Sequence, residues 1–269
     1  SLYHGAPAFS ALASLRTGAD LVTVWTDSDA RLGLVHYPSV MATTQPPLAW
    51  SPFDSLVAGP GLGRSAQRWS HLHEAALALR RDASIILDAD ALYISPENGR
   101  LLALLDELRA RRTAPSDGAV LLTPNARELE RLQQATNTDD LAGLARSLAF
   151  PFILAKGETD VLATPSGRTV SLEVGAGAPR RCGGLGDLLS GALGTWLSWL
   201  TRGRATGELT VDDEGVAEAQ VVDAVRAATR LVRAASTLAY ARKHRGMLAD
   251  DVLADLPDAF QQLWPDDQQ

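Results

Sequence analysis

Short apolar runs alternate with segments of helical spacing along most of this chain. Three of these runs, residues 85–87, 120–122 and 152–155, contain no polar residue. Uninterrupted apolar strands are typical of a parallel sheet that is covered on both faces. Strands that alternate with helices predict a doubly wound, largely parallel α/β fold. No solenoid repeat and no glycine- or serine-rich linker divides the sequence, so we expect a single domain over residues 1–269.

The same signals predict the other elements. Residues 21–25 and 55–58 are expected to form strands, and residues 161–174 a hairpin at the edge of the sheet. Helices are expected over residues 66–81, 101–112 and 216–244, and from the apolar run that begins at Leu188. The polar segment 201–215 is interpreted as a surface loop.

Composition excludes several classes of function. The net charge of −7 over 269 residues argues against non-specific nucleic-acid binding, which needs a basic face. No apolar run approaches the length of a membrane span, so we expect no membrane partner. A single cysteine excludes an internal disulfide framework and fits a reducing compartment, either the cytoplasm or the mitochondrial matrix.

The segment 180–191, Arg-Arg-Cys-Gly-Gly-Leu-Gly-Asp-Leu-Leu-Ser-Gly, carries the strongest chemical signal. Glycines before a helix allow a tight turn and close approach of a ligand. The first amides of a helix lack internal partners and lie at the positive end of its dipole, which favours a phosphate. A carboxylate at this position repels phosphate, so its presence needs a chemical reason. One such reason is that it acts as the base that takes the proton from the hydroxyl group about to be phosphorylated. Asp187 is therefore interpreted as a base, and the alternative is an ordinary glycine turn with Asp187 as a dipole partner.

Polar residues follow other expected strands. The segment 59–63, Gly-Pro-Gly-Leu-Gly, is either a phosphate-binding loop or a simple tight turn. Asp88 and Asp90 lie at the sheet edge where ligands bind in open α/β folds, and they either hold Mg²⁺ or cap the following turn. Lys156 either reaches a nucleotide phosphate or belongs to a solvated turn.

Two further patterns have structural alternatives. Asn125, Glu128 and Arg131 are spaced by three and would share one helical face, although Asn125 is also a good helix-capping residue. The arginines beside Cys182 would lower the pKa of its thiol, but no base lies nearby, so Cys182 is interpreted as a small loop residue. No zinc-ligand spacing, P-loop or dinucleotide fingerprint with its acidic residue is found.

The segment RRCGGLGDLLSG resembles the signature of the ATP- or ADP-dependent (S)-NAD(P)H-hydrate dehydratases, a carbohydrate-kinase-like branch of the ribokinase-like superfamily. The segments LYHGAP, GADLVTV, AGPGLGR, LDADAL, LTPNARE and KGETD resemble the same family in the same order. The resemblance implies a three-layer α/β/α sandwich with a central, mostly parallel sheet. It also places a strand and a glycine turn before Tyr3, so we expect an amino-terminal strand to be missing through truncation or removal of a leader.

The resemblance further implies two sets of site residues. The loop 5–7 and the following residues would contact the dinucleotide substrate: Gly61, Asn125, Ala126, Arg127, Glu128, Leu129, Glu130, Arg131 and Asp187. The residues that would surround ATP are Lys156, Gly157, Glu158, Thr159, Asp160, Gly177, Ala178, Pro179, Arg180, Arg181, Cys182, Gly183, Gly184, Leu185 and Gly186. The resemblance assigns no metal ligands.

The implied reaction is a repair of damaged nicotinamide nucleotides by a carbon–oxygen lyase. ATP would phosphorylate (6S)-NADHX or NADPHX, and loss of phosphate would restore NADH or NADPH, with Asp187 as the catalytic base and Mg²⁺ as a cofactor. ADP in place of ATP, a homo-oligomer and a functional partnership with an NAD(P)H-hydrate epimerase are left open. The alternatives are a kinase that phosphorylates a sugar or vitamin-precursor alcohol, and a non-catalytic nucleotide-binding module. An intact Asp187 counts against the module.

Overall fold

The computed structural model describes residues 5–27, 31, 33–93 and 99–265. Residues 2–4 of the LYHGAP segment therefore lie outside the described residues. The chain divides into two compact units. The first unit comprises residues 1–48, 174–196 and 224–269, and the second comprises residues 49–173 and 197–223.

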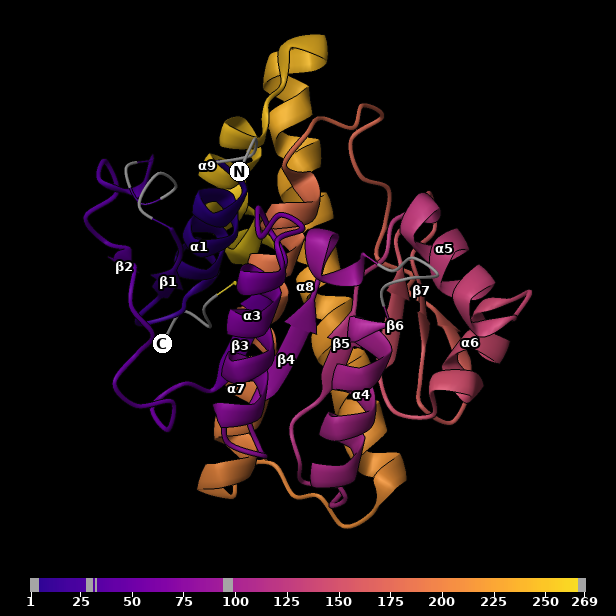
Figure 1. The fold of residues 1–269 in the computed structure, drawn as a ribbon. Helices are drawn as coiled ribbons and strands as arrows, with labels where there is room; N and C mark the ends of the chain where they lie inside the picture. The colour runs from indigo at the N-terminus through magenta and orange to yellow at the C-terminus, as the bar shows by residue number, and fades with distance from the viewer. Residues whose placement is uncertain (1–4, 28–30, 32, 94–98, 266–269) are drawn as a thin grey trace. The chain divides into compact units, whose positions relative to one another are not determined.

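The second unit is built on a six-stranded sheet (Figure 1). In spatial order its strands are β3 (Ser55–Ala58), β4 (Ser84–Leu87), β5 (Val120–Leu122), β6 (Phe152–Ala155), β7 (Val161–Ala163) and β8 (Thr169–Ser171). Strands β3 to β6 are parallel, whereas β7 and β8 are antiparallel to their neighbours. The mostly parallel sheet and the hairpin at its edge are thus confirmed.

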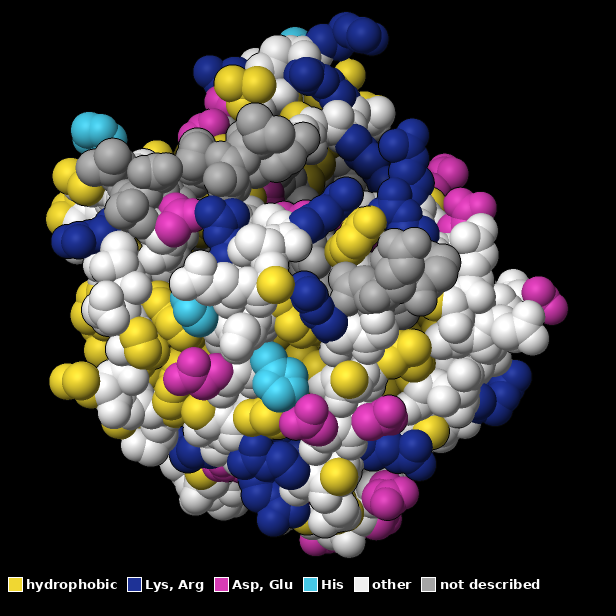
Figure 2. All heavy atoms as spheres, in the orientation of Figure 1, with side chains coloured by type: hydrophobic (Ala, Val, Ile, Leu, Met, Phe, Trp, Pro, Cys, Tyr) yellow, Lys and Arg dark blue, Asp and Glu magenta, His cyan; other side chains and the backbone are white. Residues whose placement is uncertain are grey.

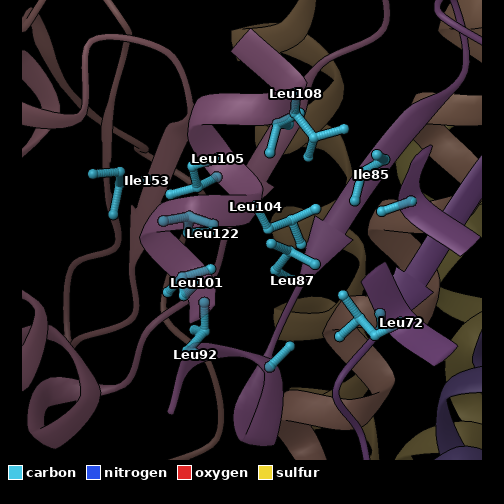
Figure 3. Packing of buried hydrophobic residues seen from close by; sticks show 14 of the residues in the cluster. Leu72, Ile85, Leu87, Leu92, Leu101, Leu104, Leu105, Leu108, Leu122 and Ile153 are labelled. Carbon is cyan, nitrogen blue, oxygen red and sulfur yellow. The ribbon is translucent and has the colours of Figure 1, made fainter. Parts of the chain in front are cut away.

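Helices pack on this sheet through leucines. The helices of the unit's first half are α3 (Ala66–Ala78), η1 (Ala89–Leu92), α4 (Arg100–Arg111), α5 (Ala126–Thr136) and α6 (Leu141–Leu148). Leu72 of α3 and the leucines of α4 pack against Ile85 and Leu87 of β4 (Figure 3). Ile86, which points to the opposite face, is also fully buried. Burial on both faces explains why the strand sequence is continuously apolar.

The first unit contains α1 (Gly5–Thr17), a parallel pair formed by β1 (Thr23–Trp25) and β2 (Met41–Thr43), η2 (His244–Gly246) and α9 (Ala249–Leu263). It also contains the start of α7 (Leu185–Thr206) and most of α8 (Glu214–Lys243). Figure 2 shows Lys and Arg side chains gathered where α8 ends, and its last turn carries Arg242 and Lys243. Both pair with carboxylates of α9, Arg242 with Asp255 and Lys243 with Asp251 at 3.9 Å. Such cations also suit the negative end of the α8 dipole.

Small residues let α1 approach the beginning of α7. The Oγ of Ser14 donates to the carbonyl oxygen of Gly191 at 2.9 Å, and the Oγ of Thr195 donates to that of Ser14 at 3.0 Å. A Cβ at Gly191 would lie 2.1 Å from the carbonyl oxygen of Ser10, so only glycine fits this crossing. The contact fixes the first turns of α7 against α1.

One expectation about the long helices α7 and α8 is corrected. The surface loop expected over residues 201–215 is wrong over most of its length, because α7 continues to Thr206 and α8 begins at Glu214. The Oγ of Thr201 donates to the carbonyl oxygen of Leu197, so a polar residue is accommodated inside the helix. Strand β2 falls in a segment where no strand was expected, because its three residues are too few to show a period.

Candidate active site

Four residues each directly follow one of the parallel strands of the second unit. Gly59 follows β3, Asp88 follows β4, Thr123 follows β5 and Lys156 follows β6. The Oδ1 atom of Asp88 accepts hydrogen bonds from the Oγ of Thr123 at 2.7 Å and from the Nζ of Lys156 at 2.8 Å. The carboxyl edge of three neighbouring strands therefore carries one connected polar row. Thr123 was not among the residues expected at the site, although its place directly after an apolar strand was a signal.

The structure tests one of the two alternatives for the acidic residues after β4, which is capping of the following turn. The side chain of Asp88 makes no cap hydrogen bond to η1 and instead pairs with Lys156, so its interpretation as a cap is wrong. Asp90 accepts a hydrogen bond from the main-chain N–H of Gly63 at 2.8 Å and thereby holds the glycine segment that contains Gly61. Within the described ranges, no group of three or more His, Cys, Asp or Glu side chains could hold a metal ion. The described side chains thus offer Mg²⁺ no cage of their own.

The segment that contains Gly61 is a true left-handed turn. Gly59, Gly61 and Gly63 all have positive φ angles, of 123°, 66° and 72°. The N–H of Leu62 donates to the carbonyl oxygen of Gly59, and the segment ends at Ser65, whose side chain caps α3. Glycine adopts such positive φ angles without steric cost, and Gly61 itself is half-buried.

The helix start at Asn125 is a capping box. Asn125 Oδ1 accepts hydrogen bonds from the N–H groups of Arg127 and Glu128, and Glu128 Oε2 accepts one from the N–H of Asn125 at 2.9 Å. Both side chains therefore stabilise the first turn of α5, as capping alone would predict. Ala126, Arg127, Glu130 and Arg131 are exposed, and Leu129 packs partly against the core. The structure confirms the helix here, whereas contact with a substrate stays a prediction.

The carboxyl group of Glu128 has an altered pKa. Burial raises the pKa of Glu128, while its hydrogen bond from the N–H of Asn125 and the nearby charge of Lys156 act in the opposite direction. Asp88 adds to the rise because a second negative charge disfavours ionisation. The Glu128 carboxyl group therefore lies near enough to the Asp88–Lys156 ion pair for both charges to act on its pKa.

The turn after Lys156 is held by its own last residue. Asp160 is buried, and its Oδ1 accepts a hydrogen bond from the N–H of Gly157 at 2.9 Å. Glu158 and Thr159 between them are exposed. Asp160 therefore acts as a structural residue of this turn, and the interpretation of the whole segment as solvated is wrong at Asp160 and at the largely buried Lys156.

The glycine turn of the first unit leads directly into α7. Gly184 has a φ of 93° and supplies the carbonyl oxygen for the N–H of Leu188, so it stands at the start of the helix. Asp187 is a half-buried member of the first helical turn. The N–H groups of such a first turn have no acceptor within their own helix. Main-chain donors and a carboxylate are therefore placed together, as the sequence predicts.

The loop before this turn is tied to α8 and to the segment that follows it. The N–H of Ala178 donates to the Oγ of Ser236 at 3.0 Å, next to Gly177. The guanidinium of Arg180 donates to the carbonyl oxygens of Arg245 and Met247. Pro179 and Arg181 are exposed. Arg180 thus serves as an anchor of the loop.

The expectation for Cys182 is corrected. Burial raises the pKa of the Cys182 thiol, and the charge of Arg180 offsets only part of that rise. A raised pKa leaves less thiolate at neutral pH, which argues against a nucleophile. The raised pKa of the thiol agrees with the interpretation of Cys182 as an ordinary loop residue.

Known proteins resemble the chain over nearly its whole length. A family model described as NAD(P)H-hydrate dehydratase matches residues 1–258. The ATP-dependent (S)-NAD(P)H-hydrate dehydratase of Entamoeba histolytica is 31% identical over 280 residues, which cover 97% of this chain and 84% of the relative.

Two solved structures share the fold. The ADP/ATP-dependent NAD(P)H-hydrate dehydratase of Bacillus subtilis, co-crystallized with ATP/Mg²⁺, has a TM-score of 0.65 at 22% identity and covers 97% of this chain and 88% of its own. A ribokinase-like superfamily protein of Enterococcus faecalis has a TM-score of 0.64 at 20% identity and covers 97% of this chain and 84% of its own. The ribokinase-like α/β fold is thus confirmed. No helix in the described part of the chain has the length and apolar character to span a bilayer.

Three observations indicate the same family: the match of the family model, the identity to the Entamoeba enzyme, and the glycine turn before Asp187. This chain belongs to the NAD(P)H-hydrate dehydratase family.

Proposed function

We propose that this chain catalyses the ATP-dependent dehydration of (6S)-NADHX and (6S)-NADPHX to NADH and NADPH, with release of ADP and phosphate. Membership of the family and the name of the Entamoeba relative support this reaction. In reaction class the enzyme is a carbon–oxygen lyase. We further propose that the two compact units act as one functional domain.

The observation that carries the proposal is the place of Asp187 in the first turn of α7, directly after the left-handed Gly184. Water is a poor leaving group, so the hydrate hydroxyl must be phosphorylated before the carbon–oxygen bond breaks. We assign Asp187 as the base that takes the hydroxyl proton. The main-chain N–H groups of Gly183, Gly184, Leu185 and Gly186 stabilise the phosphoryl group as negative charge shifts during transfer.

The binding residues are assigned by the family's motifs. ATP is bound by the loop 177–182, in which Arg180 anchors the main chain, and by the turn 156–160, in which Lys156 contributes its ammonium. The dinucleotide contacts Gly61 and the exposed first turns of α5, residues 125–131. These roles fit the structure because the turn at Gly61 and the start of α5 both present main chain at the carboxyl edge of the sheet.

Mg²⁺ is part of the proposal as a companion of ATP, whose triphosphate charge it neutralises when bound. Magnesium in such enzymes keeps water and phosphate oxygens among its ligands, which is compatible with the lack of a metal cage in the described residues. We propose a cytoplasmic location, with the mitochondrial matrix as the alternative. A homo-oligomer and a functional partnership with an NAD(P)H-hydrate epimerase are proposed on the family resemblance alone.

The proposal is tested with purified protein, NADH hydrate, and ATP or ADP in parallel. Recovery of the absorbance of reduced nicotinamide, coupled to release of phosphate, supports it. Asp187→Ala should abolish turnover while ATP still binds, because only the proton acceptor is removed. Retention of most activity by this variant would contradict the assignment of the base. Accumulation of a phosphate ester on another alcohol, without recovery of NADH, would instead identify a kinase.

A further inference from the structure

We propose that Asp88 and Thr123 are positioning residues, which hold the ammonium group of Lys156 in one place for binding the phosphates of ATP. The inference rests on the proposed function, because that function assigns Lys156 to ATP. Neither Asp88 nor Thr123 is among the residues that the family resemblance assigns to either substrate.

The ion pair fixes a side chain that is otherwise flexible. The ammonium group of lysine lies at the end of a flexible four-carbon side chain, so an unpaired ammonium samples many positions. Here the Nζ of Lys156 lies 2.8 Å from the Oδ1 of Asp88, and the exposed fractions of the two side chains are 18% and 3%. A charge-assisted hydrogen bond to a buried, immobile carboxylate therefore restricts the ammonium. An ammonium has three donors, so this bond leaves capacity for phosphate oxygens.

Thr123 orients the carboxylate itself. Its Oγ donates to the same Oδ1 atom at 2.7 Å, and its main-chain N–H donates to the carbonyl oxygen of Leu87 at 3.1 Å. Thr123 is 1% exposed, and a β-branched side chain has few rotamers. Two rigid strands therefore define the position of one oxygen atom, and that oxygen defines the position of the ammonium.

Stability alone is a weak reason for such an arrangement. A buried ion pair is often no more stable than well-packed apolar residues of the same volume. This pair also lies at the carboxyl edge of a parallel sheet, where open α/β folds bind their ligands, and not at the opposite edge. A positioning role explains both why the pair is buried and why it is found at this edge.

Positioning and simple electrostatics predict opposite effects of removing the charge of Asp88. The carboxylate repels a triphosphate, so if charge alone mattered, Asp88→Asn would tighten ATP binding. If Asp88 positions Lys156, the same change weakens ATP binding, because the ammonium loses its fixed place. The sign of the change in ATP affinity therefore decides between the two.

The test measures ATP binding by isothermal titration in the absence of dinucleotide, followed by steady-state kinetics on the folded full chain. We expect Asp88→Asn to raise the Kd for ATP by about tenfold, the lower end of what loss of a supporting partner costs at metal-binding sites. Thr123→Val, which keeps both charges, should raise it by a smaller factor. In the background of Lys156→Met, Asp88→Asn should change the Kd by less than about twofold, since coupled residues are not additive.

A matched control exists at the opposite edge of the sheet. Asp54 directly precedes β3 and pairs with Arg80 at 3.0 Å, so Asp54→Asn also removes a paired carboxylate of this unit. It should leave the Kd for ATP unchanged. The KM for the dinucleotide should stay unchanged in the Asp88 and Thr123 variants, which separates loss of a positioning group from general damage.

The possible outcomes distinguish a failure of the positioning role from a failure of the proposed function. If wild-type protein binds ATP and restores NADH while Asp88→Asn and Thr123→Val bind ATP as tightly as wild type, the positioning role alone is refuted. Tighter binding by Asp88→Asn refutes it as well. If wild-type protein binds no ATP, the proposed function fails first and the positioning role falls with it. Should Asp88→Asn fail to fold, Thr123→Val decides the question, because it leaves the ion pair in place.

Discussion

A Cβ atom added to Gly59 would lie 1.6 Å from the carbonyl oxygen of Asp88. The main chain that leaves β3 thus lies directly against the main chain that leaves β4. The N–H of Asp88 also donates to the carbonyl oxygen of Ala58 at 3.0 Å, so the parallel ladder continues to the residue that carries the ion pair. Because Gly59 has no side chain, the main chain of Asp88 can lie at the position from which its carboxylate reaches Lys156.

Gly59→Ala should therefore damage both stability and the polar row. The φ of Gly59 is 123°, which an alanine rarely adopts, and its Cβ would force the end of β4 to move. We expect the free energy of unfolding to fall by at least about 3 kcal/mol, measured by urea denaturation. Gly99→Ala is the control, since nothing lies within 4 Å of a Cβ at Gly99. Equal stability of the two variants would show that the backbone at Gly59 relaxes.

Much of the second unit could be predicted because its signals are local. The apolar runs that became β4, β5 and β6 are buried on both faces, and a sequence alone shows that pattern. The caps at Ser65 and Asn125 are also local, because each side chain bonds to an N–H two or three residues further on. Such signals depend on short stretches of chain.

The polar row could not be predicted in the same way. The partners Asp88 and Lys156 are 68 residues apart, and they meet only because β4, β5 and β6 are parallel neighbours in register. The sequence showed that each residue ends a strand, but not that the carboxylate faces the lysine. The direction of the Cys182 pKa was missed for a related reason. Its flanking arginines are visible in the sequence, whereas burial, which has the larger effect, is not.

Glu128→Gln should make stability less dependent on pH. Burial raises the pKa of Glu128, so the folded chain binds this proton more strongly than the unfolded chain does. Ionisation of Glu128 therefore lowers the free energy of unfolding as pH rises from the ordinary carboxyl range through the raised folded value. At pH values above that window the whole penalty is present, and below the window it is absent.

Glutamine carries no charge and still offers an oxygen to the N–H of Asn125, so the capping box is kept. We expect the difference in the free energy of unfolding between Glu128→Gln and wild type to become more favourable to the variant when the pH is raised from 4 to 7. Urea denaturation at the two pH values measures this difference. Glu130→Gln removes an exposed carboxylate from the same helix and should show a smaller gain. The interpretation fails if the two variants respond to pH alike.

Gly184→Ala should show whether the left-handed conformation at Gly184 shapes the phosphate-binding turn. The φ of Gly184 is 93°, and a Cβ there would lie 2.9 Å from the Cβ of Ala249 and 3.2 Å from the ring of Phe9. The helices α1 and α9 would have to shift, so we expect a loss of about 1–3 kcal/mol in the free energy of unfolding. Because the same turn aims the first N–H groups of α7, the kcat of dehydration should fall by more than the loss of folded protein explains. Gly99→Ala is again the control, since a Cβ at Gly99 meets nothing within 4 Å and the residue lies outside the proposed site. Denaturation and kcat measured on both variants check the prediction, and equal effects of the two substitutions would mean that the left-handed conformation at Gly184 does not shape the site.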